Sequence, residues 1–423
     1  MIDMDGRIQE LIDFTDSKIG LESYYLARYS LNRKVNLLNE TIYTLDMEWF
    51  PKDAEEVEED LNPEGTAVVE LQIDNRKFHS IIFVGGKSFA TRLTFSNIGK
   101  EQVIEWMELE TKLKYGAQFE LVEENEREYR FRECYYGVQV SPSGYIEIKF
   151  DEEMKLVFYS LYGSFPPKEQ FKQETFSLCL DDIECYAKEQ LKKLELPSFE
   201  KSQLVPVYAI EELFIRNDVS KTYPFELFVK YQACVELNEI IHWETPINKP
   251  FERVEIQFHE DISPEQAFSC EPHPDLESIT KIEMETAISE ITNFLRQVYP
   301  KDAGKWMLKT LHRENRYVHA TLRQHKAENG GLQRKLLIFL DKSLKAVNYL
   351  DNEPMIEMVQ DFEKPRDVNI MHGEAFAKMK PYLELEPVYV YDFDEKRFVL
   401  CGKLDSNDAV HAVSGEVISL DDI

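Results

Sequence analysis

The chain has 423 residues, and its 43% hydrophobic and 12% aromatic content excludes an intrinsically disordered protein. This length exceeds what one hydrophobic core usually serves, so it predicts two or three domains. Lysine and arginine number 49 against 79 aspartate and glutamate, a formal net charge of −30, which disfavours nucleic acid and anionic lipid surfaces as partners.

The cysteine spacing and the amino terminus bear on the cellular compartment. The six cysteines have no paired short spacing, which argues against a disulfide framework and a four-cysteine zinc site. Residues 1–6 contain neither a basic region nor an apolar core, and no later run of about eighteen apolar residues could span a bilayer. We therefore expect free thiols and a cytoplasmic protein without membrane insertion.

The amino-terminal segment predicts a short helix followed by strands up to residues 47–51. The acidic stretch 53–60 is predicted to be a linker, and an alternating strand follows it over 68–73. Together these elements form the first expected domain, residues 1–94. The helix is indicated by an apolar stripe of Ile8, Leu11, Ile12 and Ile19.

Residues Val84–Ser88 follow an apolar run and superficially resemble a phosphate-binding loop, whose glycines let backbone N–H groups surround a phosphate. The full pattern needs a glycine at position 81, where Ile81 stands, and no clear helix opens after Ser88. We predict a hairpin turn at this place.

The second half of the chain repeats features of the first half at an offset close to 190 residues. The first matched pair shares Asp, Lys, Val and Tyr at fixed places. Agreement at separate places in the same order predicts an internal duplication. The matched pairs are 151–159 with 341–349, 184–188 with 374–378, and the strand openings 204–210 with 385–391.

Each repeat is predicted to begin with an amphipathic helix. The clearest apolar stripe lies within 284–298 and ends before Pro300, and its earlier partner lies within 103–113. A third helix is predicted over 180–194, ending before Pro197. A fourth is expected to end early because of Pro381.

The segment after each helix alternates with a period near two and predicts an antiparallel meander. The first meander covers 129–150 with a turn at Ser141–Gly144, and the later copy is expected to turn at Glu328–Gly331. The second and third expected domains are residues 95–265 and 276–423. The fold class is α+β.

Two tryptophans stand at strand ends with a proline two or three residues later, Trp49 and Trp243. Because they recur at equivalent places, we expect the tryptophans to pack in the core or at a domain seam. An alternating strand is predicted after the second of them, over 254–258, and a polar, Pro-rich linker over 263–278.

Several motifs recur along the chain: Trp49 and Trp243 with their prolines, Pro-Val-Tyr at 206–208 and 387–389, and the ending 408–418. On these residues the units resemble the YcdB/YcdC repeat family, which is related to the small PepSY domain. The resemblance covers the chain from about residue 20 onward. It implies tandem PepSY-like units, each an amphipathic helix packed on an antiparallel β-meander. It also implies a non-catalytic interaction or regulatory role, because PepSY-like domains are associated with restraining peptidases or other partners.

Two groups of histidines are candidate sites. His259, Cys270 and His273 could hold zinc only with a fourth ligand, and their spacing favours an extended linker. A second group, His312, His319 and His325, lies among the arginines Arg313, Arg316 and Arg323. A proton-shuttling histidine there would need a carboxylate partner, and we expect Glu314 to point to the opposite face. We predict a solvated, locally basic sheet face.

The chain contains no Gly-x-Ser-x-Gly elbow, no His-Glu-x-x-His helix and no calcium loop. We therefore assign no catalytic, cofactor-binding or metal-binding residue and no cofactor. The leading hypothesis is a non-catalytic interaction or regulatory protein whose partner is a protein with a basic contact surface. One alternative is a hydrolase with a dispersed active site at a seam between units, and another is a protein that self-associates through sheet edges.

Overall fold

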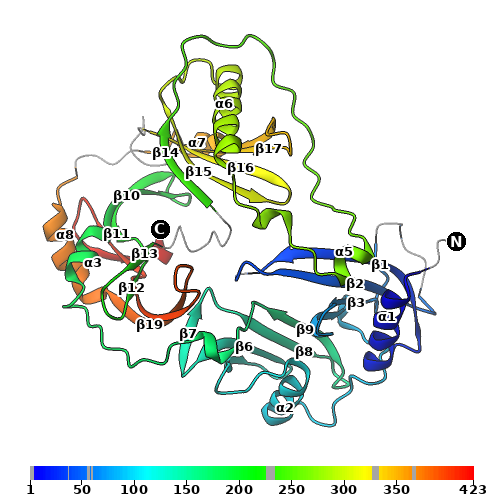
Figure 1. The fold of residues 1–423 in the computed structure, drawn as a ribbon. Coiled ribbons are helices and arrows are strands. Elements are labelled where there is room, and N and C mark those ends of the chain that lie inside the picture. Colours follow the sequence, from blue (N-terminus) through cyan, green and yellow to red (C-terminus); the bar gives the residue numbers. More distant parts are fainter. Residues whose placement is uncertain are drawn as a thin grey trace. The chain divides into compact units, whose positions relative to one another are not determined.

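The computed structural model describes residues 4–36, 38–54, 58, 61–224, 234–325, 333–363 and 368–423. Within them the chain is mixed α+β, as predicted, and most strand pairs are antiparallel (Figure 1). The chain forms two compact units. Unit 1 comprises Met1–Glu174, His259–His273 and Val388–Leu400, and unit 2 comprises Thr175–Phe258, Pro274–Pro387 and Cys401–Ile423.

Unit 1 begins with a helix followed by four antiparallel strands, which confirms the predicted amino-terminal elements. The helix begins at Asp5, whose side chain accepts from the N–H of Arg7, and ends at Gly20 in the left-handed conformation. Its predicted apolar stripe is buried in the same core as the strands. The elements are α1 (Gly6–Ile19), β1 (Tyr24–Val35), β2 (Thr41–Pro51), β3 (Ala67–Gln72) and β4 (Phe78–Phe83).

A second helix and meander complete most of unit 1. The strands pair in the order β5-β6-β8-β9, and β9 joins β4. The predicted meander is wrong for one strand. β7 does not lie between β6 and β8; it pairs with the end of β6 and runs parallel to β19. The elements are α2 (Lys100–Thr111), β5 (Phe119–Glu124), β6 (Glu128–Tyr135), β7 (Val138–Ser141), β8 (Tyr145–Phe150) and β9 (Leu156–Tyr162).

In unit 2 a long helix lies across a five-stranded sheet of order β14-β15-β16-β17-β18 (Figure 1). The helix begins with a reciprocal capping box between Thr280 and Glu283. Its predicted stripe packs against the core face of the sheet. The elements are β14 (Cys234–Ile240), α6 (Lys281–Val298), β15 (Trp306–Glu314), β16 (Tyr317–Gln324), β17 (Lys335–Leu340), β18 (Ala346–Asp351) and α7 (Glu353–Val359). The predicted turn Glu328–Gly331 lies outside the described residues.

The predicted duplication has a structural counterpart in α2 with β5, β6, β8 and β9, and α6 with β15 to β18. Both consist of a helix followed by four antiparallel strands in the same order. Both also have the same turn between the last two strands. Asp151 accepts from the N–H groups of Glu153 and Lys155, and Asp341 accepts from those of Ser343 and Lys345.

The rest of unit 2 contains two helix-plus-strand segments, one after α3 and one after α8, and strands of each segment pair with strands of the other. β11 pairs with β21, and β12 pairs with β20, so neither segment completes its sheet alone. The unit boundary falls within β19 and β20. The elements are α3 (Glu184–Gln190), β10 (Leu191–Ser198), β11 (Gln203–Ile210), β12 (Leu213–Arg216), β13 (Thr222–Pro224), α8 (His372–Met379), β19 (Glu384–Asp392), β20 (Arg397–Asp405), β21 (Asp408–His411) and β22 (Val417–Ser419).

Some predicted elements are wrong. The third helix ends at Gln190 rather than 194, because the next residues form β10, which pairs with β11 over its whole length. Consequently 204–210 lies in the second strand after its helix, whereas 385–391 lies in the first, and the two segments are not equivalent. The fourth helix ends at Met379, before Pro381, as predicted.

The segment 254–258 forms no strand, because its hydrogen bonds are isolated, with the N–H of Val254 donating to Val347 O of β18 and Arg316 donating to Gln257 O. The expected linker 263–278 is also corrected. It contains α5 (Pro264–Phe268) and the 3-10 turn η3 (Pro274–Leu276), and Ala267 is fully buried in the core of unit 1.

Two further features bear on expectations from the sequence. All six cysteines are free thiols. Among the described residues, no helix combines the length and apolar character needed to cross a bilayer.

Candidate functional site

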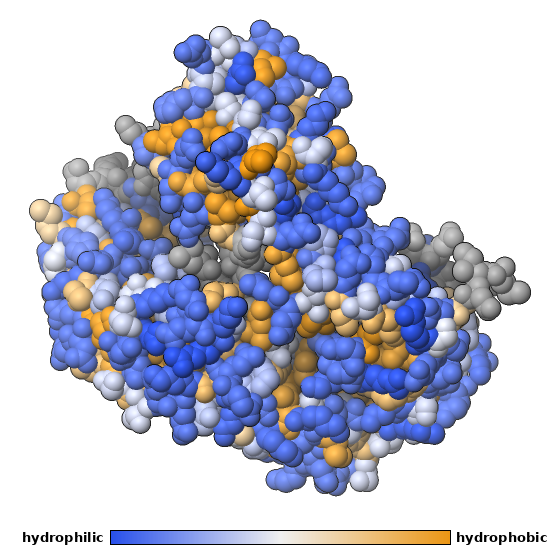
Figure 2. All heavy atoms as spheres, viewed as in Figure 1, coloured by the Kyte–Doolittle hydropathy of each residue, from blue (hydrophilic) through white to orange (hydrophobic). Residues whose placement is uncertain are grey.

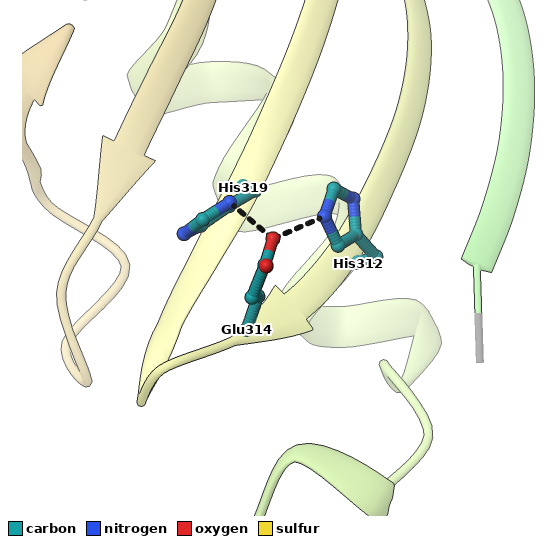
Figure 3. A group of neighbouring side chains, drawn as sticks. All are labelled: His312, Glu314 and His319. Atoms are coloured by element: carbon teal, nitrogen blue, oxygen red, sulfur yellow. Dashed lines mark hydrogen bonds and ion pairs between the residues drawn. The ribbon is translucent and has the colours of Figure 1, made fainter. Parts of the chain in front are cut away.

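Two histidines and one glutamate meet at the end of the β15–β16 hairpin. His312 and His319 stand directly opposite each other in the antiparallel ladder. Glu314 follows His312 by two residues, and its Oε2 accepts from His312 Nε2 at 3.2 Å and lies 3.1 Å from His319 Nδ1. Figure 3 shows the carboxylate between the two imidazoles, one from each strand.

The prediction that Glu314 points to the opposite face is wrong, and strand geometry explains why. Arg313 reaches the helix side of the sheet, where its guanidinium donates to Glu283 of α6 at 2.6 Å. Side chains alternate along a strand, so both neighbours of Arg313 lie on the other face. His312 and Glu314 therefore share the face opposite α6.

The expected solvated, basic sheet face is wrong for two of its three histidines. His312 and His319 are 8% and 5% exposed, and their ring centroids lie 5.1 Å apart. Phe339 of β17 contacts the ring of His319 at 4.7 Å between centroids. Only His325, just beyond β16, is exposed as predicted.

The electrostatics of the cluster favour an ionised carboxylate. The hydrogen bonds from His312 and then His319 hold the pKa of Glu314 well below its usual range, although partial burial opposes them. His312 Nδ1 and His319 Nε2 are buried without a hydrogen-bond partner. The three facing atoms, all within 4.8 Å of one another, are one oxygen and two imidazole nitrogens, which can bind a proton or a metal ion.

Part of the signal for this arrangement is present in the sequence, because asparagine tolerates the positive φ that a two-residue hairpin loop requires. In the structure Asn315 and Arg316 both have positive φ, 50° and 70°, and form the two-residue loop of the hairpin. Such a loop fixes the register of the flanking strands, which places residue 312 opposite residue 319. The expectation for Glu314 did not take into account that it is the second residue after His312 and therefore lies on the same face of the strand.

The glycine-containing segment Val84–Ser88 is neither a hairpin turn nor a phosphate-binding loop. It opens with a 3-10 turn, η1 (Val84–Gly86), with Gly85 and Gly86 at positive φ, and no strand or helix follows it directly. The hairpin prediction is therefore wrong, because β4 pairs onward with the distant strand β9.

A cavity of about 480 Å³ lies beside this segment in unit 1. Two lysines that line the cavity already have partners. Lys52 Nζ donates to Glu22 O, and Lys87 Nζ lies 3.3 Å from the carboxylate of Glu64. The lining offers no histidine or cysteine. It consists of Ser23, Pro51, Lys52, Asp53, Ala54, Pro63, Glu64, Lys87 and Phe89.

The histidines of the expected linker are not assembled into a site. His259 Nε2 lies 3.2 Å from Asp261, Cys270 is exposed, and His273 is buried. Among the described residues, three or more potential metal ligands cluster at 312, 314 and 319 and not here.

The tryptophans occupy packing positions, as predicted. Trp49 and Trp306 are buried, Trp106 contacts the ring of Tyr159, and Trp243 packs against the core beside α6.

A buried carboxyl group in unit 1 was not foreseen from the sequence. Glu133 on β6 is 1% exposed, and its Oε2 accepts from the N–H of Gly144 at 2.9 Å. Its Oε1 is buried without a hydrogen-bond partner. Burial raises the pKa of Glu133 to about 8, although the bond from Gly144 opposes this, so the carboxyl is protonated at neutral pH.

A pair of exposed methionines was also not foreseen. Met355 and Met358 of α7 are 67% and 66% exposed, and helical spacing puts them on the same side of this short helix. Exposed carboxylates of Glu357 and Asp361 lie within the same stretch of chain.

No family model matches this chain, and comparisons with curated proteins and with solved structures likewise found no match.

Proposed function

We propose that this chain is a non-catalytic interaction or regulatory protein that binds a protein partner with a basic contact surface. The observation that carries the proposal is the exposed Met355 and Met358 pair on α7, set among carboxylates. Methionine side chains are flexible and polarizable, and they are frequent on surfaces that bind other proteins. Contiguous exposed apolar surface marks sites of interaction with other molecules, and the two methionines are neighbours on one side of α7.

The charge of the chain specifies the chemistry of the partner. The net charge is −30, and hydrophilic residues cover most of the face shown in Figure 2. An apolar contact surrounded by carboxylates favours an amphipathic segment that carries lysine or arginine beside its apolar residues. The partner in this proposal is therefore a basic amphipathic segment of another protein.

The resemblance to the YcdB/YcdC repeat family belongs to the same proposal. We propose that the helix-plus-meander segments are PepSY-like units. The shared strand order of β5-β6-β8-β9 and β15-β16-β17-β18 supports this, as does the shared aspartate turn. The proposed compartment is the cytoplasm, supported by the six free thiols.

The alternative, a hydrolase, gains no support from the cavity of unit 1. A hydrolytic site requires a nucleophile or an activated water with a general base beside it. The cavity lining contains one serine, Ser23, and the potential bases Asp53, Glu64 and Lys87, of which Glu64 and Lys87 are paired with each other. Within the described residues Ser23 makes no side-chain hydrogen bond to any of these groups, so the lining shows no assembled nucleophile and base. We therefore favour the interaction role.

The test compares proteins captured from the native cell by three versions of the full chain. We expect a stoichiometric partner with the wild-type chain and its loss with the double variant Met355→Ser, Met358→Ser. The matched control is Leu109→Ser, Ile282→Ser, which removes two side chains that are 60% and 77% exposed on other helices. Recovery of the same partner with all three versions would contradict the proposal.

A further inference from the structure

The donor atoms of the β15–β16 hairpin point to a metal site. We propose that His312, Glu314 and His319 bind one divalent transition-metal ion, with Zn²⁺ as the preferred ion. The carboxylate oxygen lies 3.2 Å from His312 Nε2 and 3.1 Å from His319 Nδ1. Zinc binds nitrogen and oxygen at about 2.0 to 2.2 Å, which places tetrahedral ligand atoms roughly 3.3 to 3.6 Å apart. The two distances from the carboxylate oxygen to the histidine nitrogens are therefore only slightly shorter than those of a tetrahedral zinc site.

The strands hold these ligands in place before any ion binds. His312 and His319 form a directly opposed pair of the ladder, and Glu314 stands two residues beyond. The two-residue loop fixes this register, and Phe339 restricts the ring of His319. Sites built on paired strands keep their geometry better than sites built on loops, so little ordering of side chains opposes binding.

The ligand types select the class of ion. Two imidazole nitrogens and one carboxylate oxygen suit zinc and its neighbours, whereas Mg²⁺ and Ca²⁺ prefer an all-oxygen shell. The third distance, between the two imidazole nitrogens, is within 4.8 Å, so the histidines must approach each other for tetrahedral binding. The glutamate side chain is 45% exposed, whereas the histidine side chains are 10% and 6% exposed. Access for the ion and for a fourth ligand, water, is therefore from the side of Glu314.

The burial of the histidines limits the orientations of their rings. Each is more than nine-tenths buried, and the ring nitrogens that face Glu314 are His312 Nε2 and His319 Nδ1. The opposite nitrogens, His312 Nδ1 and His319 Nε2, are buried without a hydrogen-bond partner and take no part in the proposed site. The expectation of no metal came from ligand spacing along the chain, which does not include ligands brought together by strand register.

The experiment uses the full chain, purified without a histidine tag, stripped with a chelator and titrated with Zn²⁺ by calorimetry. We expect one Zn²⁺ per chain and no comparable binding of Mg²⁺ or Ca²⁺. His312→Asn, His319→Asn and Glu314→Gln should each weaken binding at least about tenfold, the lower end of what loss of an outer-shell partner costs. The control His325→Asn removes an exposed histidine just beyond the same strand and should bind as the wild type does.

A spectroscopic measurement on the wild-type protein covers the case in which a variant fails to fold. X-ray absorption of the zinc-loaded chain should show two imidazole ligands with oxygen in the remaining positions. The proposal is overturned if the stripped wild-type chain binds no Zn²⁺, if any of the three folded variants binds it as tightly as the wild type, or if the spectrum shows sulfur ligands.

Discussion

Replacing Glu133 with glutamine should remove the loss of stability that unit 1 suffers as pH rises toward neutral. The buried carboxyl has a pKa of about 8 in the folded chain, against an ordinary value of 4.5. Between these two values the folded state holds a proton that the unfolded state has lost. The free energy of unfolding therefore falls as pH rises from about 4.5 to about 8, by up to about 1.4 kcal/mol per pH unit from this group.

The magnitude depends on the distance between the working pH and the ordinary pKa. At pH 7 this distance is about 2.5 units, which corresponds to a cost of about 3 kcal/mol for keeping Glu133 protonated. Glutamine has nearly the same shape, stays neutral at every pH, and its carbonyl oxygen can accept from the N–H of Gly144 as the carboxyl does. The stability of the variant relative to the wild type should rise by about 3 kcal/mol between pH 4.5 and pH 7, on top of a pH-independent cost of burying the amide NH2 where Oε1 has no partner.

The assay is hydrogen exchange of the β6 and β8 amides in increasing urea, which gives the opening free energy of this part of unit 1. Glu128→Gln removes an exposed carboxylate from the same strand and should change stability by under about 0.5 kcal/mol. If the difference in stability between Glu133→Gln and the wild type is the same at pH 5 and at pH 8, the assignment of a buried, protonated carboxyl is refuted.

Three further predictions concern a helix cap, a turn and the proposed partner. Thr280→Ala should lower the free energy of unfolding of the α6 region by about 1 kcal/mol in urea denaturation, because it removes the capping box. Thr286→Ala, at an exposed interior position of the same helix, should be neutral or stabilising, and equal losses in both would contradict the cap. Met154→Gly should raise the free energy of unfolding by about 0.5 to 1 kcal/mol, because φ at Met154 is 59°, whereas Glu153→Gly in the same turn should lower it. The association rate with the captured partner should fall from low to high salt while the dissociation rate changes less, since screening acts on encounter, and an association rate indifferent to salt would contradict the electrostatic proposal.

Local patterns predicted the elements whose signals lie within one stretch of chain. The helix over 284–298 has an apolar stripe and a capping box, and the structure forms it from Lys281 to Val298. The predicted third helix failed because its last residues belong to β10, whose partner β11 outweighs their helical spacing. The alternating pattern over 254–258 predicted a strand that does not form. Here the local pattern is present, but no neighbouring strand pairs with it continuously.

The candidate site depended on a relation between two strands, and this limited its prediction. His312 and His319 are seven residues apart, a spacing that matches no metal motif, and only the hairpin register makes them neighbours. Glu133 shows a second limit. Its position in an alternating strand is visible in the sequence, but the burial that raises its pKa comes from the surrounding fold.

The exchanged pairing of β11 with β21 and of β12 with β20 has a consequence for how the protein is made. The segment 191–216 leaves the ribosome well before the residues 401–411 that complete its sheets. At roughly 5 to 20 residues per second, this delay is on the order of ten to forty seconds. During that time the edges of β11 and β12 are without their final partners and open to pairing with another nascent chain. The carboxyl-terminal strands therefore complete the sheets that the earlier strands begin, and a chain that stops before residue 401 leaves those edges permanently exposed.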